Sequence, residues 1–207
     1  ANRGKMLELI KSELIEVISG IQPIQDGEIE IKSVEINSHN SKDHSELRKL
    51  GLAHVPEDRH YTGLVLPFVE YENSILGIHD HKAFKSGPFL DLENIKNDAK
   101  LKIEKYDIRP ANCQLKTANF SGGNQQKIVL SREIETNPDV LIIGQPTRGV
   151  DVGAIEFIHK RILQMRDEGK AILLISVELE EIRALADRVL VMFEGGVVGE
   201  VEPTATN

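Results

Sequence analysis

The residues best suited to chemistry form one short run, Ser121-Gly122-Gly123-Asn124-Gln125-Gln126-Lys127. Two adjacent glycines restrict the backbone so little that consecutive N–H groups can point at one anion. Residues 128–134 follow with helical spacing, and the N-terminus of a helix presents unpaired N–H donors and the positive end of its dipole. The run therefore predicts a phosphate-binding site. Taken without its surroundings, a Ser-Gly-Gly turn favours a flexible loop over a phosphate site.

A second run downstream favours the phosphate site. Residues 140–143 are fully apolar and predict a buried strand, and after them comes Gly144-Gln145-Pro146-Thr147-Arg148-Gly149-Val150-Asp151. A phosphate-type loop, its helix, a buried strand and a Pro/Gly loop ending in Asp resemble the signature helix, Walker B strand and D-loop of an ABC-type ATPase. The resemblance is strongest to the second nucleotide-binding half of bacterial importers of simple sugars or nucleosides, whose signature typically reads S-G-G-N-Q-Q-K. It extends from roughly residue 12 to residue 201.

The resemblance implies an α/β fold with a P-loop NTPase-type core, in which a mainly parallel sheet with an antiparallel edge is flanked by helices. Residues 1–66 and 119–207 are expected to form this core, and residues 67–118 an inserted helical subdomain that leads into the signature helix. Near-continuous apolar strands favour a parallel sheet that is buried on both faces. The expected helices are 6–19, 40–50, 92–106, 154–167 and 179–186, and the expected strands are 28–34, 52–55, 140–143, 171–176, 188–193 and 197–201.

In the resembled family two nucleotide-binding domains pair head to tail, so that each signature faces the Walker A loop of the other domain. The residues implied to bind ATP held by the partner half are Ser121, Gly122, Gly123, Asn124 and Gln125. Asp151 then belongs to the D-loop. Glu57 occupies the Q-loop position, the hinge between core and subdomain; the alternative for this segment is a charged surface turn.

The Walker A loop is missing from the sequence as it stands. Lys11 and Ser12 align with the end of that motif, but no glycine precedes Lys11. Either the protein lacks the loop or the printed chain omits it, and both explanations stay open. As written, the sequence favours a solvated helix residue for Lys11 over a phosphate ligand.

Three positions that carry the family's chemistry differ here. Gly144 and Gln145 stand where the family has a magnesium-binding Asp and a water-orienting Glu, and Val177 stands where it has a switch histidine. Glycine offers no side-chain oxygen, and a neutral glutamine is a poor proton acceptor. We therefore predict a degenerate catalytic site, so that this chain by itself is expected to be inactive as an ATPase.

Composition restricts the remaining function classes. The 207 residues carry a formal net charge of −8, which argues against a nucleic-acid binder. No apolar run reaches the roughly 20 residues of a membrane-spanning helix, so we expect a soluble protein that docks at the cytoplasmic face of the membrane. The single Cys113 fits a reducing compartment and is most simply a small filler residue. The tripeptide His79-Asp80-His81 has no second cluster to complete a metal shell, and it predicts a solvated loop.

These inferences give one main hypothesis and two rivals. The main hypothesis is the C-terminal ATPase domain of an ABC importer for simple sugars or nucleosides. It uses ATP and Mg²⁺ in the assembled transporter, and its partners are permease subunits and a second nucleotide-binding domain on the same polypeptide. The first rival is a catalytically dead ABC domain that acts as a regulatory or docking module. The second, an ABC ATPase of translation or DNA repair, predicts basic arms that this acidic chain lacks.

Overall fold

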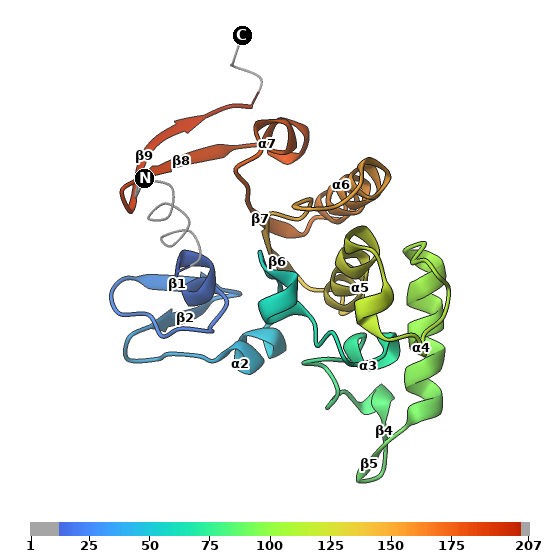
Figure 1. Ribbon diagram of the computed structural model, residues 1–207. Helices are drawn as coiled ribbons and strands as arrows, with labels where there is room; N and C mark the ends of the chain where they lie inside the picture. The colour runs from blue at the N-terminus through green and yellow to red at the C-terminus, as the bar shows by residue number, and fades with distance from the viewer. Residues whose placement is uncertain (1–12, 204–207) are drawn as a thin grey trace. The chain divides into compact units, whose positions relative to one another are not determined.

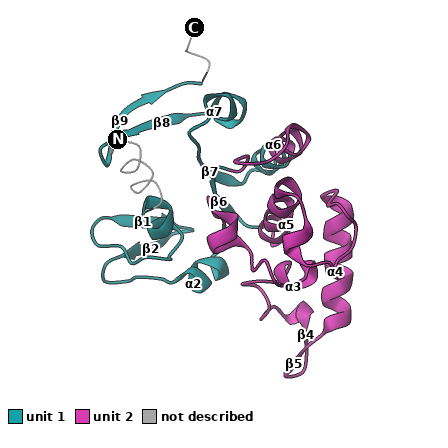
Figure 2. Cartoon of the chain, in the orientation of Figure 1, with its two compact units in different colours: residues 1–54, 138–145, 161–207 teal, residues 55–137, 146–160 magenta. Residues whose placement is uncertain are grey.

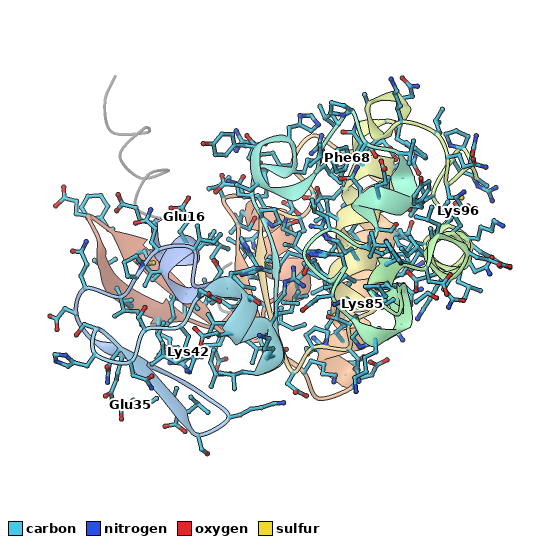
Figure 3. The ribbon with its side chains drawn as sticks, turned by 90° about the horizontal axis from the view of Figure 1, so that it is seen from below. Glu16, Glu35, Lys42, Phe68, Lys85 and Lys96 are labelled. Carbon is cyan, nitrogen blue, oxygen red and sulfur yellow. The ribbon has the colours of Figure 1, made fainter. Side chains whose placement is uncertain are left out.

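The computed structural model describes residues 13–203 (Figure 1). The chain divides into two compact units (Figure 2). Unit 1 comprises residues 1–54, 138–145 and 161–207, and unit 2 comprises residues 55–137 and 146–160. Figure 3 draws the side chains and labels three residues of unit 1, Glu16, Glu35 and Lys42. The predicted limits of the helical subdomain, 67–118, stay a prediction.

A three-stranded sheet forms the centre of unit 1. Its order is β3 (Leu52–Val55), β6 (Val140–Gly144) and β7 (Ala171–Ile175), and β6 runs parallel to β7. All of β3 is buried, as are the last four residues of β6, as their apolar sequences predict. The core beside β6 gathers apolar side chains from the helical residues 13–18 and from the first hairpin and helix of the unit: Ile15, Ile24, Ile31, Ile36, Leu47, Leu52 and Ile142. The parallel sheet of the predicted α/β fold is thus present.

The first hairpin corrects a predicted element. Residues 28–34 are not one strand but two, β1 (Glu28–Ile31) and β2 (Val34–Asn37), which pair antiparallel. The chain reverses at Lys32 and Ser33, whose φ angles are 51° and 62°. Two consecutive positive φ angles make the tight turn that suits the twist of a hairpin. Neither Lys nor Ser is typical there, which is why the sequence did not indicate the turn.

The helices of unit 1 begin at local signals. In α2 (His44–Lys49), Asp43 accepts from the N–H of Glu46, and the Glu46 carboxylate accepts from the N–H of Asp43, a capping box. The short capped helix predicted in 40–50 is confirmed. The helix α7 (Leu179–Leu185) also lies in unit 1, and the last residues of α6 (Val152–Asp167) belong to it. The helix predicted for 6–19 is described only from residue 13 onward, where 13–18 are helical.

The two last strands, β8 (Val189–Phe193) and β9 (Gly196–Val201), form an antiparallel hairpin. Many of their large apolar side chains are exposed in the described part of the chain: Leu190, Val191, Phe193, Val197, Val198 and Val201. The sequence predicted an antiparallel edge of the main sheet, but β8 and β9 form a separate two-stranded sheet, and burial on both faces is wrong for these strands. Among the described residues, β8 and β9 pair as strands only with each other.

Unit 2 is mainly helical. It contains the π-helical turn η1 (Arg59–Gly63), α3 (Glu70–Asn73), α4 (Leu92–Lys105) and α5 (Gly122–Ile134), together with the start of α6. Short turns and one small hairpin connect them: η2 (Lys82–Phe84), β4 (Lys85–Ser86), β5 (Phe89–Leu90) and η3 (Thr117–Asn119). Figure 3 labels three residues of this unit, Phe68, Lys85 and Lys96.

The apolar face predicted for residues 92–106, at positions 92, 95, 99, 103 and 106, is buried except at Leu92. Ile95, Ala99 and Tyr106 are fully buried, but Leu92 is 52% exposed. In its place the chain buries Lys102, whose ammonium donates to the carbonyl of Ser74 and pairs with Asp98. A lysine is buried only where such partners neutralise and hydrogen-bond its charge.

Candidate functional site

The signature tip, residues 121–124, lies at the start of α5 in unit 2. The hydroxyl oxygen of Ser121 caps the helix by accepting from the backbone N–H of Asn124 at 3.4 Å and from its side-chain amide at 2.9 Å. Asn124 is itself oriented, because its Oδ1 accepts from the N–H of Arg109 at 2.7 Å. A hydroxyl that accepts two hydrogen bonds keeps its own proton for a third partner. Since Ser121 is exposed, that proton is available to an external anion.

The two signature glycines have a packing role that the sequence did not suggest. A Cβ at Gly122 would lie 2.8 Å from Nη2 of Arg59 and 2.9 Å from the carbonyl oxygen of Gly149. A Cβ at Gly123 would lie 2.7 Å from Oδ2 of Asp151. These separations are too short for any side chain. The glycines are therefore needed so that α5 can approach the 148–151 loop, whatever ligand is bound.

Two further residues of the signature run point inward. Gln125 is buried, and its amide donates to the carbonyls of Thr117 and Phe120 while its oxygen contacts the His60 ring at 2.8 Å. Lys127 is also buried and donates to the carbonyl of Asp107 at 3.0 Å. Its ammonium lies 4.8 Å from the centre of the Phe157 ring, within cation–π range. These side chains hold the helix in place, and the tip itself is formed by Ser121, Gly122, Gly123 and Asn124.

Asp151, the predicted D-loop residue, lies next to this tip. Its Oδ1 accepts from the N–H of Ala154 at 2.9 Å and so caps the start of α6. A cavity of about 270 Å³ opens here, lined by Asp107, Arg109, Gly123, Asn124, Lys127, Asp151, Gly153 and Ala154. Two carboxylates and two cationic groups line it, so the lining side chains balance in charge. The helices α5 and α6 both begin at this lining, and their N-termini add the positive ends of two helix dipoles.

The predicted Q-loop residue also belongs to unit 2. The Glu57 carboxylate accepts from Nη1 of Arg148 at 3.1 Å, and its side chain is 13% exposed. Asp58 follows and caps the turn η1 by accepting from the N–H groups of His60 and Tyr61. Glu57 is thus tied to the loop that ends in Asp151. Asp58 and residues 60–62 are exposed, so the charged surface turn, the alternative from the sequence, also fits this segment.

The three positions predicted to have lost their chemistry lie in unit 1 at one edge of its sheet. Gly144 is the last residue of β6 and is paired with Ile175 of β7. Gln145 follows with φ 42°, is buried, and donates its N–H to the carbonyl of Ile175 at 2.8 Å. Val177 lies two residues beyond β7 and is 52% exposed. The carboxyl ends of parallel strands bring these positions together, as a shared catalytic edge requires.

For the remaining predicted sites the structure shows no arranged functional groups among the described residues. Lys11 and Ser12 lie outside the described residues. Within residues 13–203, no group of three or more His, Cys, Asp or Glu side chains is arranged to hold a metal ion. His79 and His81 therefore form no metal site in the described chain. Nor does any helix of the described chain have the length and apolar character needed to cross a membrane.

One residue was missed by the sequence analysis. Arg59 donates from Nη1 to the carbonyl of Arg148 at 2.9 Å, although the two residues are 89 positions apart. Its position directly after Glu57-Asp58 marked it as part of the segment, but no local pattern indicates which loop it contacts.

Comparison with known proteins identifies the family. Residues 11–148 match the family model described as "ABC transporter". The chain belongs to the ABC transporter family.

Curated relatives of this ABC chain include the nucleoside import ATP-binding protein NupA of Lactococcus lactis and the guanosine import ATP-binding protein NupO of Bacillus subtilis. Each is 42% identical over 196 residues, a stretch that covers 95% of this chain and 38% of the relative. The ribose import ATP-binding protein RbsA of Oceanobacillus iheyensis is 35% identical over 191 residues, covering 92% of this chain and 38% of the relative. The chain thus spans less than two fifths of the length of these relatives.

Solved structures show the same fold. An ATP-binding cassette in a dimeric post-hydrolysis state bound to ADP and Pi superposes with a TM-score of 0.75 at 21% identity, covering 95% of this chain and 82% of that one. A nucleotide-free ATP-binding cassette from an ABC transporter gives a TM-score of 0.72 at 22% identity, covering 93% and 76%. The predicted ABC ATPase α/β fold is therefore confirmed.

Proposed function

We propose that this chain is the second, C-terminal ATP-binding cassette of an importer for nucleosides or simple sugars. In this proposal it supplies its signature to ATP held by a partner cassette on the same polypeptide. Support comes from the relatives, whose names describe import of nucleosides, guanosine or ribose. The function is coupling of ATP binding and hydrolysis to uptake of the solute.

The geometry of the signature tip carries the proposal. Ser121 is exposed and keeps its hydroxyl proton for an outside acceptor, because its oxygen accepts twice from Asn124. The first N–H groups of the 13-residue helix α5 lie beside it, where backbone donors and the helix dipole favour negative charge. A terminal phosphate of ATP provides several acceptor oxygens and the matching charge. In the paired arrangement these groups bind the γ-phosphate in trans.

The chain's own catalytic edge is proposed to be impaired. Gly144 and Gln145 provide no carboxylate at the end of β6, and Val177 provides no imidazole beyond β7. Phosphoryl transfer to water needs a metal shell and a group that orients the water. The assembled importer is then asymmetric, with one hydrolytic site completed by this signature and one impaired site on this side. ATP and Mg²⁺ are its cofactors, and Lys11 and Ser12 are the remnant of the Walker A motif.

Two further partners follow from this assignment. Membrane permease subunits are proposed to contact the helical subdomain and the segment around Glu57, at the cytoplasmic face of the membrane. Closure of the two cassettes around ATP then reaches the permease through this segment. Asp151 would contribute to the contact between the cassettes, since it lies beside Gly123 at the same tip.

The test uses Ser121, since Gly122 is unsuitable. Any side chain at Gly122 collides with Arg59 and the carbonyl of Gly149, so a loss of activity there would report misfolding. Ser121→Asp instead keeps an N-cap that helices favour, but it places a negative charge against the phosphate. In the full-length transporter reconstituted with its permease, we expect Ser121→Asp to lower kcat/KM for ATP at least about tenfold.

The matched control is Ser121→Thr, which keeps a neutral hydroxyl cap, and we expect its kcat/KM to stay within about threefold of the unsubstituted protein. Equal ATPase activity for Ser121→Asp and the unsubstituted protein would refute the assignment. The rival function, a regulatory or docking module, is favoured by the loss of chemistry at Gly144 and Gln145. It predicts that Ser121→Asp still binds the permease and leaves hydrolysis unchanged.

A further inference from the structure

Residues 57–60 contact both functional loops of unit 2. Glu57 accepts from the guanidinium of Arg148, and Arg59 donates back to the Arg148 carbonyl. His60 contacts the side chain of Gln125 in α5. One four-residue stretch therefore joins the 148–151 loop to the signature helix.

Arg59 is the centre of this connection. Its Nη1 lies 2.9 Å from the carbonyl oxygen of Arg148, and its Nη2 makes a longer bond of 3.5 Å to the carbonyl oxygen of Gly149. The same Nη2 occupies the space beside Gly122, where a Cβ would be only 2.8 Å away. A planar guanidinium can bind two successive carbonyls at once, which a lysine ammonium on its flexible stem does less well. The residue therefore fits between the two motifs by its shape as well as by its charge.

This placement is energetically unfavourable for the arginine itself. Its Nε is buried with no hydrogen-bond partner in the described part of the chain. Burial also lowers the pKa of Arg59, an effect that the charge of Asp58 partly offsets. A desolvated polar group of this kind costs stability unless it is needed for another reason. Here the reason is geometric: the guanidinium fixes the distance between Gly122 and the 148–149 backbone.

We propose that Arg59 is a positioning residue that couples the segment around Glu57 to the signature tip and the 148–151 loop, so that all three move as one body. The inference rests on the proposed function, because it concerns the same signature tip. The Glu57 segment, placed by that proposal against the permease, would then set the position of the groups that meet ATP. A displacement at Glu57 would move Ser121 and Asp151 together.

The test measures this coupling in the full-length transporter with Arg59→Lys, which keeps the charge and removes the fork. Amide hydrogen exchange reports local opening of each segment separately. We expect exchange to rise about tenfold in both 148–151 and 121–124, the factor for one hydrogen bond of ordinary net strength, while 141–143 is unchanged. The kcat for ATP is expected to fall about tenfold, with KM within about threefold.

The matched control is Arg166→Lys, since Arg166, in unit 1, forms exposed ion pairs with Asp167 and Asp187. It should leave exchange and kcat within about twofold of the unsubstituted protein. If Arg59→Lys does not fold, Arg59→Gln replaces it, because its amide retains one donor for the Arg148 carbonyl. The melting temperature of each variant is recorded, so that a general loss of stability is recognised.

Two results would overturn the proposal. Unchanged exchange in Arg59→Lys, or faster exchange in only one of the two segments, would mean that Arg59 does not join them. The outcome is separable from the proposed function. If Ser121→Asp abolishes hydrolysis but Arg59→Lys behaves as the unsubstituted protein, the coupling alone is wrong. If Ser121→Asp hydrolyses ATP normally, the proposed function is wrong, and the exchange data still decide whether Arg59 joins the two segments.

Discussion

The buried carboxyl of Glu70 gives the most direct quantitative prediction for this chain. Glu70 is fully buried at the start of α3. Burial raises the pKa of Glu70 to about 7. The hydrogen bond from Ser74 Oγ, 2.5 Å long, and the charge of Lys102 lower this pKa but do not cancel the effect of burial, and the charge of Asp98 raises it. The second carboxyl oxygen has no hydrogen-bond partner in the described chain.

The sign of the pH dependence follows from this shift. The folded state holds the Glu70 proton more tightly than the unfolded state, whose pKa is near the ordinary 4.5. Well below pH 4.5 the carboxyl is protonated in both states, and it has no effect on the free energy of unfolding. As the pH rises to about 7, ionisation in the unfolded state lowers that free energy. With about 1.4 kcal/mol per pKa unit, the loss between about pH 5 and pH 8 is roughly 2 to 3 kcal/mol.

The substitution Glu70→Gln removes the ionisation and keeps an acceptor for Ser74. We expect its free energy of unfolding, relative to that of the unsubstituted chain, to increase by roughly 2 to 3 kcal/mol between about pH 5 and pH 8. Urea denaturation of both proteins across this range measures the difference, in which other titrating groups cancel. The control Glu104→Gln changes an exposed carboxyl of α4 and should show no such trend. A difference for Glu70→Gln that is constant with pH would refute the reasoning.

Two further predictions concern backbone packing and capping. Gly123→Ala places a Cβ 2.7 Å from Asp151 and should lower the free energy of unfolding by about 1 to 3 kcal/mol. In the control Gly153→Ala the new Cβ lies 3.5 Å from the nearest atom, an oxygen of Asp151. This control should leave stability unchanged or raise it by up to about 1 kcal/mol. Thermal denaturation compares the pair, and equal stability for both would contradict the packing role. Asp43→Ala removes the cap of α2 and should lower the free energy of unfolding by about 1 kcal/mol, while Asp43→Asn should retain most of that stability. Circular dichroism during denaturation measures both variants. Unchanged stability of Asp43→Ala would show that the capping box contributes nothing.

Several features were predictable because they depend on residues close together in the chain. The signature run and the apolar strand at 140–143 identified the ABC-type fold, since a phosphate loop, its helix and a buried strand are recognisable by composition and order. The run 40–50 predicted a short capped helix, and α2 is that helix, with Asp43 and Glu46 as its capping box. The apolar period of 92–106 predicted α4. In each case the signal and the structure span a single element.

Other features were decided only by tertiary contacts. Lys102 is buried where the period expected an exposed residue, because Ser74, 28 positions away, accepts its hydrogen bond. Leu92 fits the helical period but lies at the start of α4, where it is 52% exposed. The chain reverses at Lys32 and Ser33, two residue types that are not typical of tight turns. The pairing of β1 with β2 determines where this turn lies. Local patterns cannot encode such partners.

The same division applies to the candidate site. The sequence by itself determined that Ser121, Gly122 and Gly123 lie at the tip of a helix, and it carries the prediction of a degenerate site at Gly144, Gln145 and Val177. Only the folded chain placed Gly122 against Arg59, because a guanidinium contacts backbone carbonyls 89 positions away and leaves no periodic trace in the sequence. A carbonyl has the same chemistry at every residue, so only the tertiary structure decides which one is bound.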